Sequence, residues 1–258
     1  MEAKKIKQSS DAPSVSKTEP KSASEDYFAD FDFGKLELNL ETMLKSGLHF
    51  GHQKSRKNPQ MEPYIFTTKK GISIIDLEKS LEKLEEALAF LKKVKSDGKQ
   101  ILFVGTKEQA RGFVRSAARR CQMPHVAERW LGGTFTNFKV IRSRAKYLKD
   151  SQAKLEKGEF KVYTKLEQLK KVEELEKLEK KIGGIKDMIE LPGAIFVVDV
   201  KENELAVKEA RKVGIPIVAV VDTNNSPSFV DYPIPANDDA ISSIRLVLGY
   251  VCKALIES

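Results

Sequence analysis

Short apolar runs alternate with amphipathic helical patterns along most of the chain. Three compact runs, QILFVGT, AIFVVDV and IPIVAVVDT, have apolar residues at successive positions. Helical patterns follow these runs at about 107–121, 203–212 and 238–256, and a further one lies between Asp76 and Gly98. Strands that are apolar on both faces and separated by amphipathic helices indicate a mainly parallel sheet covered by helices on both sides. The predicted fold class is therefore α/β, in three layers.

Smaller elements are predicted at the start of this domain. Asn39 can cap a short helix that stops at Gly47. The strand-like runs YIFTT and ISIID flank the turn residues 69–71 and predict a β-hairpin. The stretch HFGHQKSRKNPQ before the hairpin is punctuated by glycine and proline, and we interpret it as a loop.

The segment between about Phe138 and Ile182 departs from the alternation, because it contains no strand-like run. Two long, highly charged helical patterns lie there, separated by EKGEFKVYT. The second pattern has a narrow apolar seam, which is typical of an α-helical coiled-coil hairpin inserted into the domain and projecting from it. The residues of the seam are Leu166, Leu169, Val172, Leu175, Leu178 and Ile182.

The N-terminal part has a different composition from the rest. Residues 1–25 are rich in Ser, Lys, Glu and Pro, so we predict a disordered extension over 1–38, followed by a domain over 39–257. The end of the extension, DYFADFDFGKLEL, alternates aromatic and acidic residues. These aromatic side chains could bind a partner or pack on the edge of the chain's own domain, and we favour the second interpretation.

Charge and cysteine content narrow the class of protein. Lysine and arginine number 45 against 37 acidic residues, and the first 40 residues carry six lysines and eight acidic side chains, so the excess of positive charge lies in the predicted domain. A basic domain favours phosphate-rich partners such as RNA. Cys121 and Cys252 stand alone among apolar neighbours, and no apolar run reaches the ~20 residues of a membrane span. We therefore expect a cytoplasmic protein.

Common signatures of enzymes are missing from the sequence. The turn after QILFV reads GTKEQA, which is neither a P-loop nor a GxGxxG dinucleotide loop. GxSxG and HExxH do not occur. These observations favour a protein that is not an enzyme and that requires no cofactor.

The first candidate RNA-binding cluster lies in LHFGHQKSRKNPQMEPYIF. Lys54, Arg56 and Lys57 follow His49 and His52 in a stretch that also contains aromatic residues. Cations interleaved with planar side chains suit contacts with phosphates and bases. The alternative is a solvated loop that its aromatic residues anchor to the core.

The second candidate cluster lies in ERWLGGTFTNFKVIRSRAKYLK. Arg142 and Lys146 stand four residues apart, so they can follow a phosphate backbone from one face of a helix. For Trp130, packing in the core is at least as good an interpretation as base stacking. The candidate RNA-binding residues are Arg129, Trp130, Lys139, Arg142, Arg144 and Lys146.

A metal site is a further candidate. Ligands of doubly wound folds bind at the carboxyl edge of the sheet, where Asp222 ends a strand and Asp239 precedes the last helix. Together with His52 they could hold a structural divalent metal such as zinc. The alternative is that these aspartates accept hydrogen bonds from backbone amides.

Eight sequence blocks, in order, carry a resemblance to a known family. The blocks are SGLHFGHQ, RKNPQMEPYIF, LFVGTKEQA, RWLGGTFTN, LEKLEKKIGGIKDM, LPGAIFVVD, GIPIVAVVDTN and IPANDDAI. They closely resemble the bacterial small-subunit ribosomal protein two family over about residues 40 to 257. The long N-terminal tail departs from the short leader that is usual there.

The resemblance implies a flavodoxin-like domain with a coiled-coil hairpin. It also implies a structural role in the small ribosomal subunit in contact with its rRNA, late incorporation during assembly, and docking of the large multidomain mRNA-binding ribosomal protein beside other small-subunit proteins. Two alternatives remain at this point. The chain could be an enzyme that binds a phosphorylated ligand near Gly105, Thr106, Lys107 and Asp222, or a module that binds a protein through its tail or hairpin.

Overall fold

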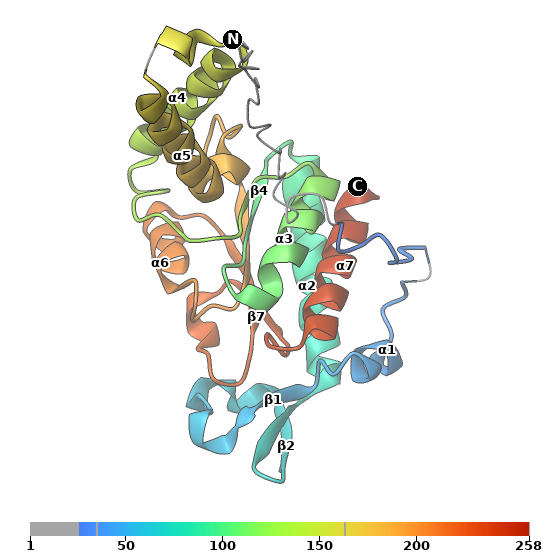
Figure 1. Ribbon diagram of the computed structural model, residues 1–258. Helices are drawn as coiled ribbons and strands as arrows, with labels where there is room; N and C mark the ends of the chain where they lie inside the picture. The colour runs from blue at the N-terminus through green and yellow to red at the C-terminus, as the bar shows by residue number, and fades with distance from the viewer. Residues whose placement is uncertain (1–25, 35, 163, 258) are drawn as a thin grey trace, which may run out of the picture.

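The computed structural model describes residues 26–34, 36–162 and 164–257 (Figure 1). Its centre is a parallel five-stranded sheet with the strand order β5-β4-β6-β7-β8. This confirms the predicted α/β class and is consistent with a flavodoxin-like fold. The strands are His125–Val126 (β5), Ile101–Val104 (β4), Ala194–Val198 (β6), Ile217–Val221 (β7) and Tyr232–Pro235 (β8).

Alternate residues of the central strands face two different helical layers. Phe103 and Phe196 are buried on one face, whereas Leu102 and Ile195 are buried on the other. The strands therefore read as continuous apolar runs, because both of their faces are covered. The first layer contains α2 (Leu77–Ser96), α3 (Glu108–Cys121) and α7 (Ile241–Ile256), and the second contains α4 (Phe138–Glu156), α5 (Lys165–Ile182) and α6 (Glu204–Val213).

A small antiparallel sheet lies at one end of the molecule (Figure 1). The predicted hairpin is confirmed, and Lys70 and Gly71 both have positive φ in its turn, as two-residue hairpin turns require. Part of the predicted loop before it is instead a strand that pairs with β3. Pairing across 20 residues leaves no local signal in the sequence. The elements are α1 (Leu40–Lys45), β1 (Phe50–Gln53), β2 (Ile65–Lys69), β3 (Ile72–Ile75) and the 3-10 helices η1 (Lys54–Arg56) and η2 (Pro59–Tyr64).

Helices α4 and α5 lie against each other at the opposite end (Figure 1). Leu175 and Ile182 of the predicted seam are buried, but Leu166 and Leu169 are 62% and 57% exposed. The seam is thus closed only in the second half of α5. Helix α4 buries no residue after Ser151, so the first turns of α5 have little apolar surface to pack against. A supercoil of the two helices stays a prediction.

The predicted boundary of the N-terminal extension needs a correction. Phe28 is fully buried and Leu36 is nearly so, both in the cluster formed by α3 and α7. Part of the span 1–38 therefore packs on the domain, as the aromatic residues indicated, while residues 1–25 lie outside the described part of the chain. None of the described helices combines the length and apolarity needed to cross a membrane.

Candidate nucleic-acid interface

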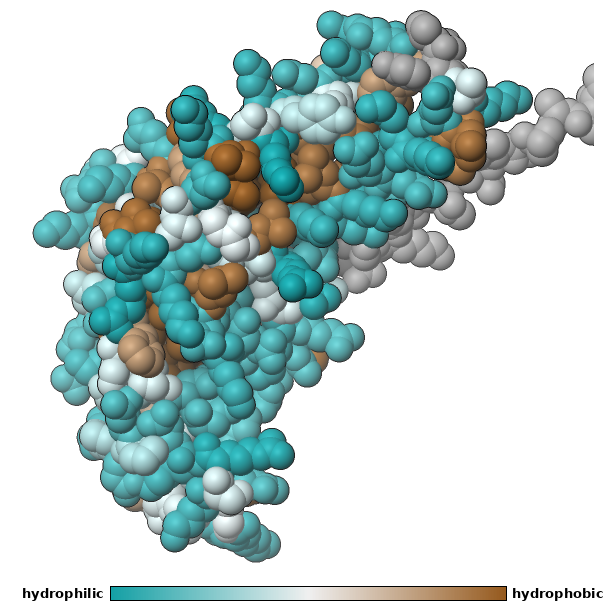
Figure 2. All heavy atoms as spheres, turned by 90° about the vertical axis from the view of Figure 1, so that its left-hand side faces the viewer, coloured by the Kyte–Doolittle hydropathy of each residue, from teal (hydrophilic) through white to brown (hydrophobic). Residues whose placement is uncertain are grey.

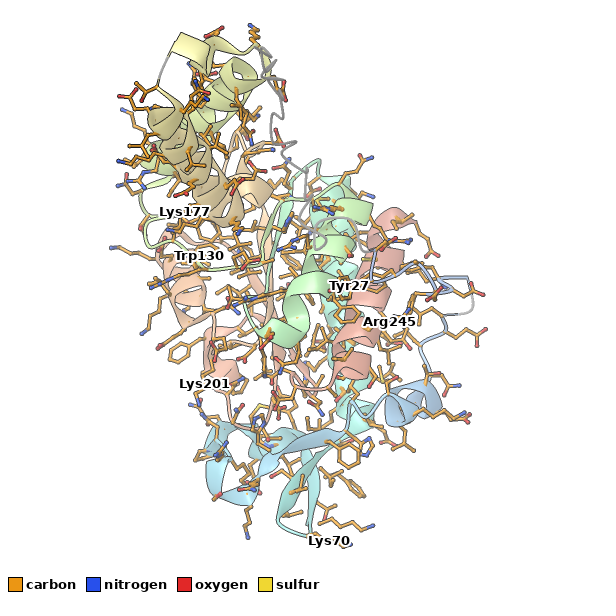
Figure 3. The ribbon with its side chains drawn as sticks, in the orientation of Figure 1. Tyr27, Lys70, Trp130, Lys177, Lys201 and Arg245 are labelled. Atoms are coloured by element: carbon orange, nitrogen blue, oxygen red, sulfur yellow. The ribbon has the colours of Figure 1, made fainter. Side chains whose placement is uncertain are left out.

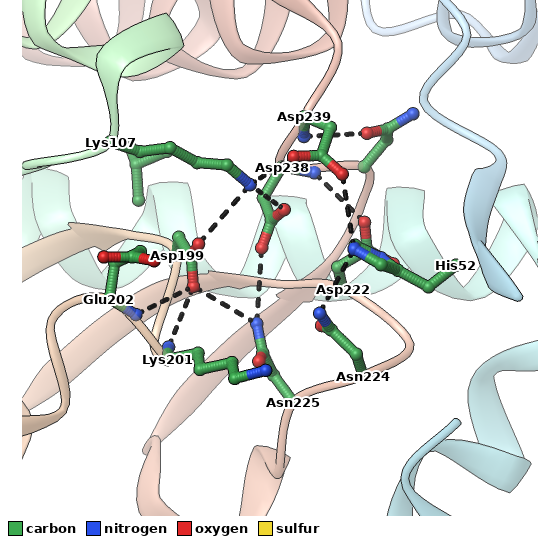
Figure 4. Close-up of polar contacts among 12 residues, drawn as sticks. His52, Lys107, Asp199, Lys201, Glu202, Asp222, Asn224, Asn225, Asp238 and Asp239 are labelled. Carbon is green, nitrogen blue, oxygen red and sulfur yellow. Dashed lines mark hydrogen bonds and ion pairs between the residues drawn. The ribbon is translucent and has the colours of Figure 1, made fainter. Parts of the chain in front are cut away.

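The carboxyl edge of the main sheet holds a network of charged side chains (Figure 4). Lys107 precedes α3, and Asp199 and Asp238 follow β6 and β8. The Lys107 ammonium nitrogen lies 2.7 Å from Asp238 Oδ1 and 3.4 Å from Asp199 Oδ2, and it also pairs with Asp239. Burial lowers the pKa of Lys107, but the hydrogen bonds and charges of these aspartates outweigh it and raise the pKa above its ordinary value. Lys107 is therefore positively charged, and its ammonium group is paired with aspartate carboxylates.

The carboxylates paired with Lys107 disfavour a phosphorylated ligand at this edge. Burial and the negative charges of Asp199 and Asp222 raise the pKa of Asp238, so the edge is already rich in negative charge. Asn225 donates to Asp238 at 3.3 Å and further closes the network. A phosphate would compete with the carboxylates for Lys107, and the carboxylates would repel its charge.

His52 connects the small sheet to the same edge. Its Nδ1 lies 3.2 Å from Asp222 Oδ1 and its Nε2 lies 3.3 Å from Asp239 Oδ2. The hydrogen bond to Asp222 raises the pKa of His52 against the opposing effect of burial. The three residues predicted to bind metal are thus neighbours. Among the described residues, however, no group of three or more His, Cys, Asp or Glu is arranged to hold a metal ion, and the metal stays a prediction.

A buried carboxylate that the sequence did not single out organises the loop before α4. Glu209 on α6 accepts hydrogen bonds from the backbone N–H groups of Gly133, Phe135 and Thr136 at 2.7, 2.9 and 3.2 Å. These donors hold the pKa of Glu209 below its ordinary value although burial opposes them. The loop that leads into the basic helix is therefore fixed to the body of the domain.

Trp130 is a core residue, which corrects its assignment to the RNA-binding set (Figure 3). Its ring is only 6% exposed and packs edge to face on Phe135 at a centroid distance of 5.0 Å. Its indole Nε1–H donates to Glu209 at 3.3 Å. A ring held in this way has no free face for a base. Its neighbour Arg129 is exposed.

The predicted cations of α4 are on the surface. Lys139, Arg142, Arg144 and Lys146 are all exposed, and none forms an ion pair with a described residue. Positions 139, 142 and 146 are three and four residues apart and share one side of the helix, away from the face that buries Ile141. Arg144 lies on the other flank. We call Lys139, Arg142 and Lys146 the α4 stripe.

The cations of the first cluster are not equivalent. Lys54 and Arg56 are exposed in η1 and form no ion pair within the described parts of the chain. Lys57, in contrast, pairs with Glu62, so part of its charge is already balanced. Two of the three predicted cations in this loop are thus available to a phosphate backbone.

Comparison with known proteins identifies the family. The family described as Ribosomal protein S2 matches residues 43–258. The chain belongs to the ribosomal protein S2 family. A Small ribosomal subunit protein uS2 of Roseiflexus castenholzii is 52% identical over 220 residues, covering 85% of this chain and 84% of the relative. The proteins of the same name from Roseiflexus sp. and Coprothermobacter proteolyticus are 50% and 48% identical over 85% of this chain and 84% and 82% of their own lengths.

Membership of the ribosomal protein S2 family excludes the enzyme alternative, because the family is a structural part of the ribosome. The pairing of Lys107 with aspartate carboxylates agrees with that conclusion. Figure 2 shows that hydrophilic side chains cover much of the face with α5 and α6, with apolar side chains scattered among them.

Proposed function

We propose that this protein is a structural constituent of the small ribosomal subunit that binds small-subunit rRNA through its exposed cations and so supports translation. The observation that carries the proposal is the α4 stripe, where neighbouring cations on one helix face have no acidic partner among the described residues. Unpaired surface cations bind phosphates by releasing condensed counterions. The names of the relatives, which are small-subunit proteins, support the same role.

The binding expected here depends on shape and charge more than on sequence. Arg142 and Lys146 point from a helix fixed to the α/β body by Glu209, so their spacing is set before RNA arrives. Phosphate contacts fix position and orientation but carry no base information. Lys54 and Arg56 form a second contact region on η1, near the small sheet at the opposite end of the molecule.

Two finer roles rest on the resemblance to the family alone. They are entry into the small subunit late in assembly, and docking of the large multidomain mRNA-binding ribosomal protein. Both require a rigid body that bridges RNA and protein. The three-layer core of this protein, in which both faces of the sheet are buried, provides such a rigid body.

The double variant Arg142→Gln/Lys146→Gln tests the proposal in the full-length protein. Binding to a small-subunit rRNA fragment is measured by titration at several salt concentrations. If each cation neutralises one phosphate, the slope of log affinity against log salt becomes shallower by about two. Folding is unchanged, because both side chains are exposed.

Lys92→Gln/Lys93→Gln is the matched control, since it removes two exposed lysines from α2 in the other helical layer. It leaves the slope at the wild-type value. Equal losses of slope in the two double variants would show that net charge, and not the α4 stripe, governs binding, and would overturn the assignment of this face.

A further inference from the structure

Residues 26–34 and 36–38, here called the aromatic cap, lie across α3 and α7 (Figure 1). The ring of Phe28 is fully buried and packs edge to face on Phe113 of α3 at a centroid distance of 6.0 Å. Phe31 and Phe33 pack against the same cluster, and Tyr27 contacts Phe113 at 5.0 Å. The cap thus places a row of aromatic side chains on two neighbouring helices.

Two glycines inside these helices make room for the rings. A β-carbon on Gly112 of α3 would lie 2.4 Å from the ring of Tyr27, and one on Gly249 of α7 would lie 2.6 Å from the ring of Phe31. Glycine in the middle of a helix costs about 0.5–1 kcal/mol relative to alanine. The close approach of an aromatic ring is a physical reason for glycine at both positions.

Arginine side chains of α3 and α7 also contact the aromatic cap. Arg120 pairs with Asp26 and lies over the Phe33 ring at 5.2 Å. Arg245, labelled in Figure 3, lies over the Phe31 ring at 5.1 Å. Such cation–π contacts favour an aromatic segment flanked by acids over a plain apolar one. Helices α3 and α7 therefore contact both the aromatic rings and the acidic side chain of the cap.

The backbone of the cap is also held by side chains of the body. Tyr250 Oη donates to the Glu37 carbonyl at 2.9 Å, and Lys253 Nζ donates to the Leu36 carbonyl at 2.9 Å. In its described residues the cap forms turns and neither a helix nor a strand. It also contacts side chains of α3 and α7, like a short peptide bound to a receptor. The match to the ribosomal protein S2 family begins after the cap, at residue 43.

We propose that the face formed by α3 and α7 is a binding groove for a short acidic, aromatic peptide, and that the cap is its ligand within the same molecule. The groove is built from Phe113, Gly112, Gly249, Arg120 and Arg245. The cap behaves as a separable segment, and the α/β body keeps its fold when the cap is exchanged. The proposal is independent of RNA binding.

The test uses the full-length chain with a specific protease site inserted between Leu38 and Asn39, cut after folding. A fluorescently labelled synthetic peptide of residues 26–38 is then added, and its anisotropy is followed. The labelled peptide replaces the resident segment saturably in the cut protein. It binds the uncut protein far more weakly, because a tethered ligand has an effective concentration of about millimolar. Circular dichroism shows an unchanged fold.

Variants identify the recognised groups. A Phe28→Ala peptide competes at least about 100-fold more weakly, the effect expected from losing a buried phenyl ring. An Ala29→Ser peptide competes like the wild type, because Ala29 is exposed. In the body, Gly249→Leu fills the space of the Phe31 ring and abolishes binding.

Three results would overturn the proposal. The first is a body that loses its circular dichroism signal when the cap leaves, which would make the cap an inseparable part of the core. The second is a resident segment that cannot be exchanged by excess peptide. The third is equal competition by the wild-type and Phe28→Ala peptides, which would show that the groove does not read the rings.

Discussion

The Glu209 carboxylate accepts a hydrogen bond of 2.7 Å from the backbone N–H of Gly133, and this contact joins α6 to the loop that carries α4 away from the sheet. Gly133 has φ of 89°, a left-handed conformation that favours glycine. Buried backbone N–H groups that lose their acceptor cost about 1–3 kcal/mol each. Glu209 therefore determines how the α4 stripe is presented.

Glu209→Ala is expected to lower the free energy of unfolding by about 2–3 kcal/mol, because it leaves the buried N–H groups of Phe135 and Trp130 without an acceptor. Urea denaturation at pH 7 measures the loss. Glu204→Gln is the control on the same helix, since Glu204 is exposed and pairs only with Lys208 among the described residues. A loss of less than about 0.5 kcal/mol in Glu209→Ala would contradict the role given to this carboxylate.

The same carboxylate predicts a pH dependence. Since the pKa of Glu209 is lower in the folded than in the unfolded state, its stabilisation is present above the unfolded value of about 4.3 and is lost as the pH falls through the folded value. The difference in unfolding free energy between the wild type and Glu209→Gln should be largest near neutral pH and shrink below about pH 4. A constant difference from pH 7 to pH 3 would contradict the lowered pKa.

The η1 loop should contribute two cations to RNA binding. Lys54→Gln/Arg56→Gln is expected to make the salt slope of rRNA binding shallower by about two, with little change in preference among RNAs of similar shape. Lys57→Gln, whose lysine is balanced by Glu62, should change the slope by less than one. Salt titrations of the two variants decide the point, and an equal effect of each cation would mean that the Lys57 pair opens on RNA.

Leu148 of α4 lies in the packed part of the α4–α5 pair, and Leu169 of α5 lies in its exposed part. Leu148 is fully buried, so Leu148→Ala should cost about 2–5 kcal/mol of unfolding free energy. Leu169 is 57% exposed, and Leu169→Ala should cost less than about 0.5 kcal/mol. Thermal and chemical unfolding of both variants provide the comparison. Equal costs would show that the first half of α5 is packed in solution.

The single tryptophan offers a direct probe of the corrected assignment. Because Trp130 is buried against Phe135 and Glu209, its emission should be blue-shifted and little quenched by iodide, and rRNA should not quench it by stacking. Strong quenching on addition of an rRNA fragment, with the fold intact, would restore Trp130 to the interface.

The central strands β4, β6 and β7 and the helices that follow them were predictable, because each pattern is local. Residues such as Phe103 and Phe196 lie in runs that are apolar on both faces. The helices between these runs have apolar residues that recur every three or four positions. The edge strands β5 and β8 are short and have no comparable apolar run, so this pattern does not predict them. Strand β1 was missed, because its partner β3 lies about 20 residues further along the chain.

The site was predicted less completely than the fold, because most of its contacts join residues that are far apart in the sequence. Exposed cations such as Arg142 can be found from helical spacing. The burial of Trp130 depends on Glu209, 79 residues away, and the balance of Lys57 depends on how η2 turns back. The Lys107 network joins the ends of separate strands, so only the folded sheet brings its members together.

Sedimentation of tagged full-length protein from a cell extract tests the ribosomal assignment most directly. The wild type should migrate with small subunits in a one-to-one ratio and stay bound in high salt, and Arg142→Gln/Lys146→Gln should dissociate at a lower salt concentration. Circular dichroism of the purified variant controls for folding. A wild-type protein found only in the free fraction, with small subunits present, would contradict the role of this chain as a constituent of the small subunit.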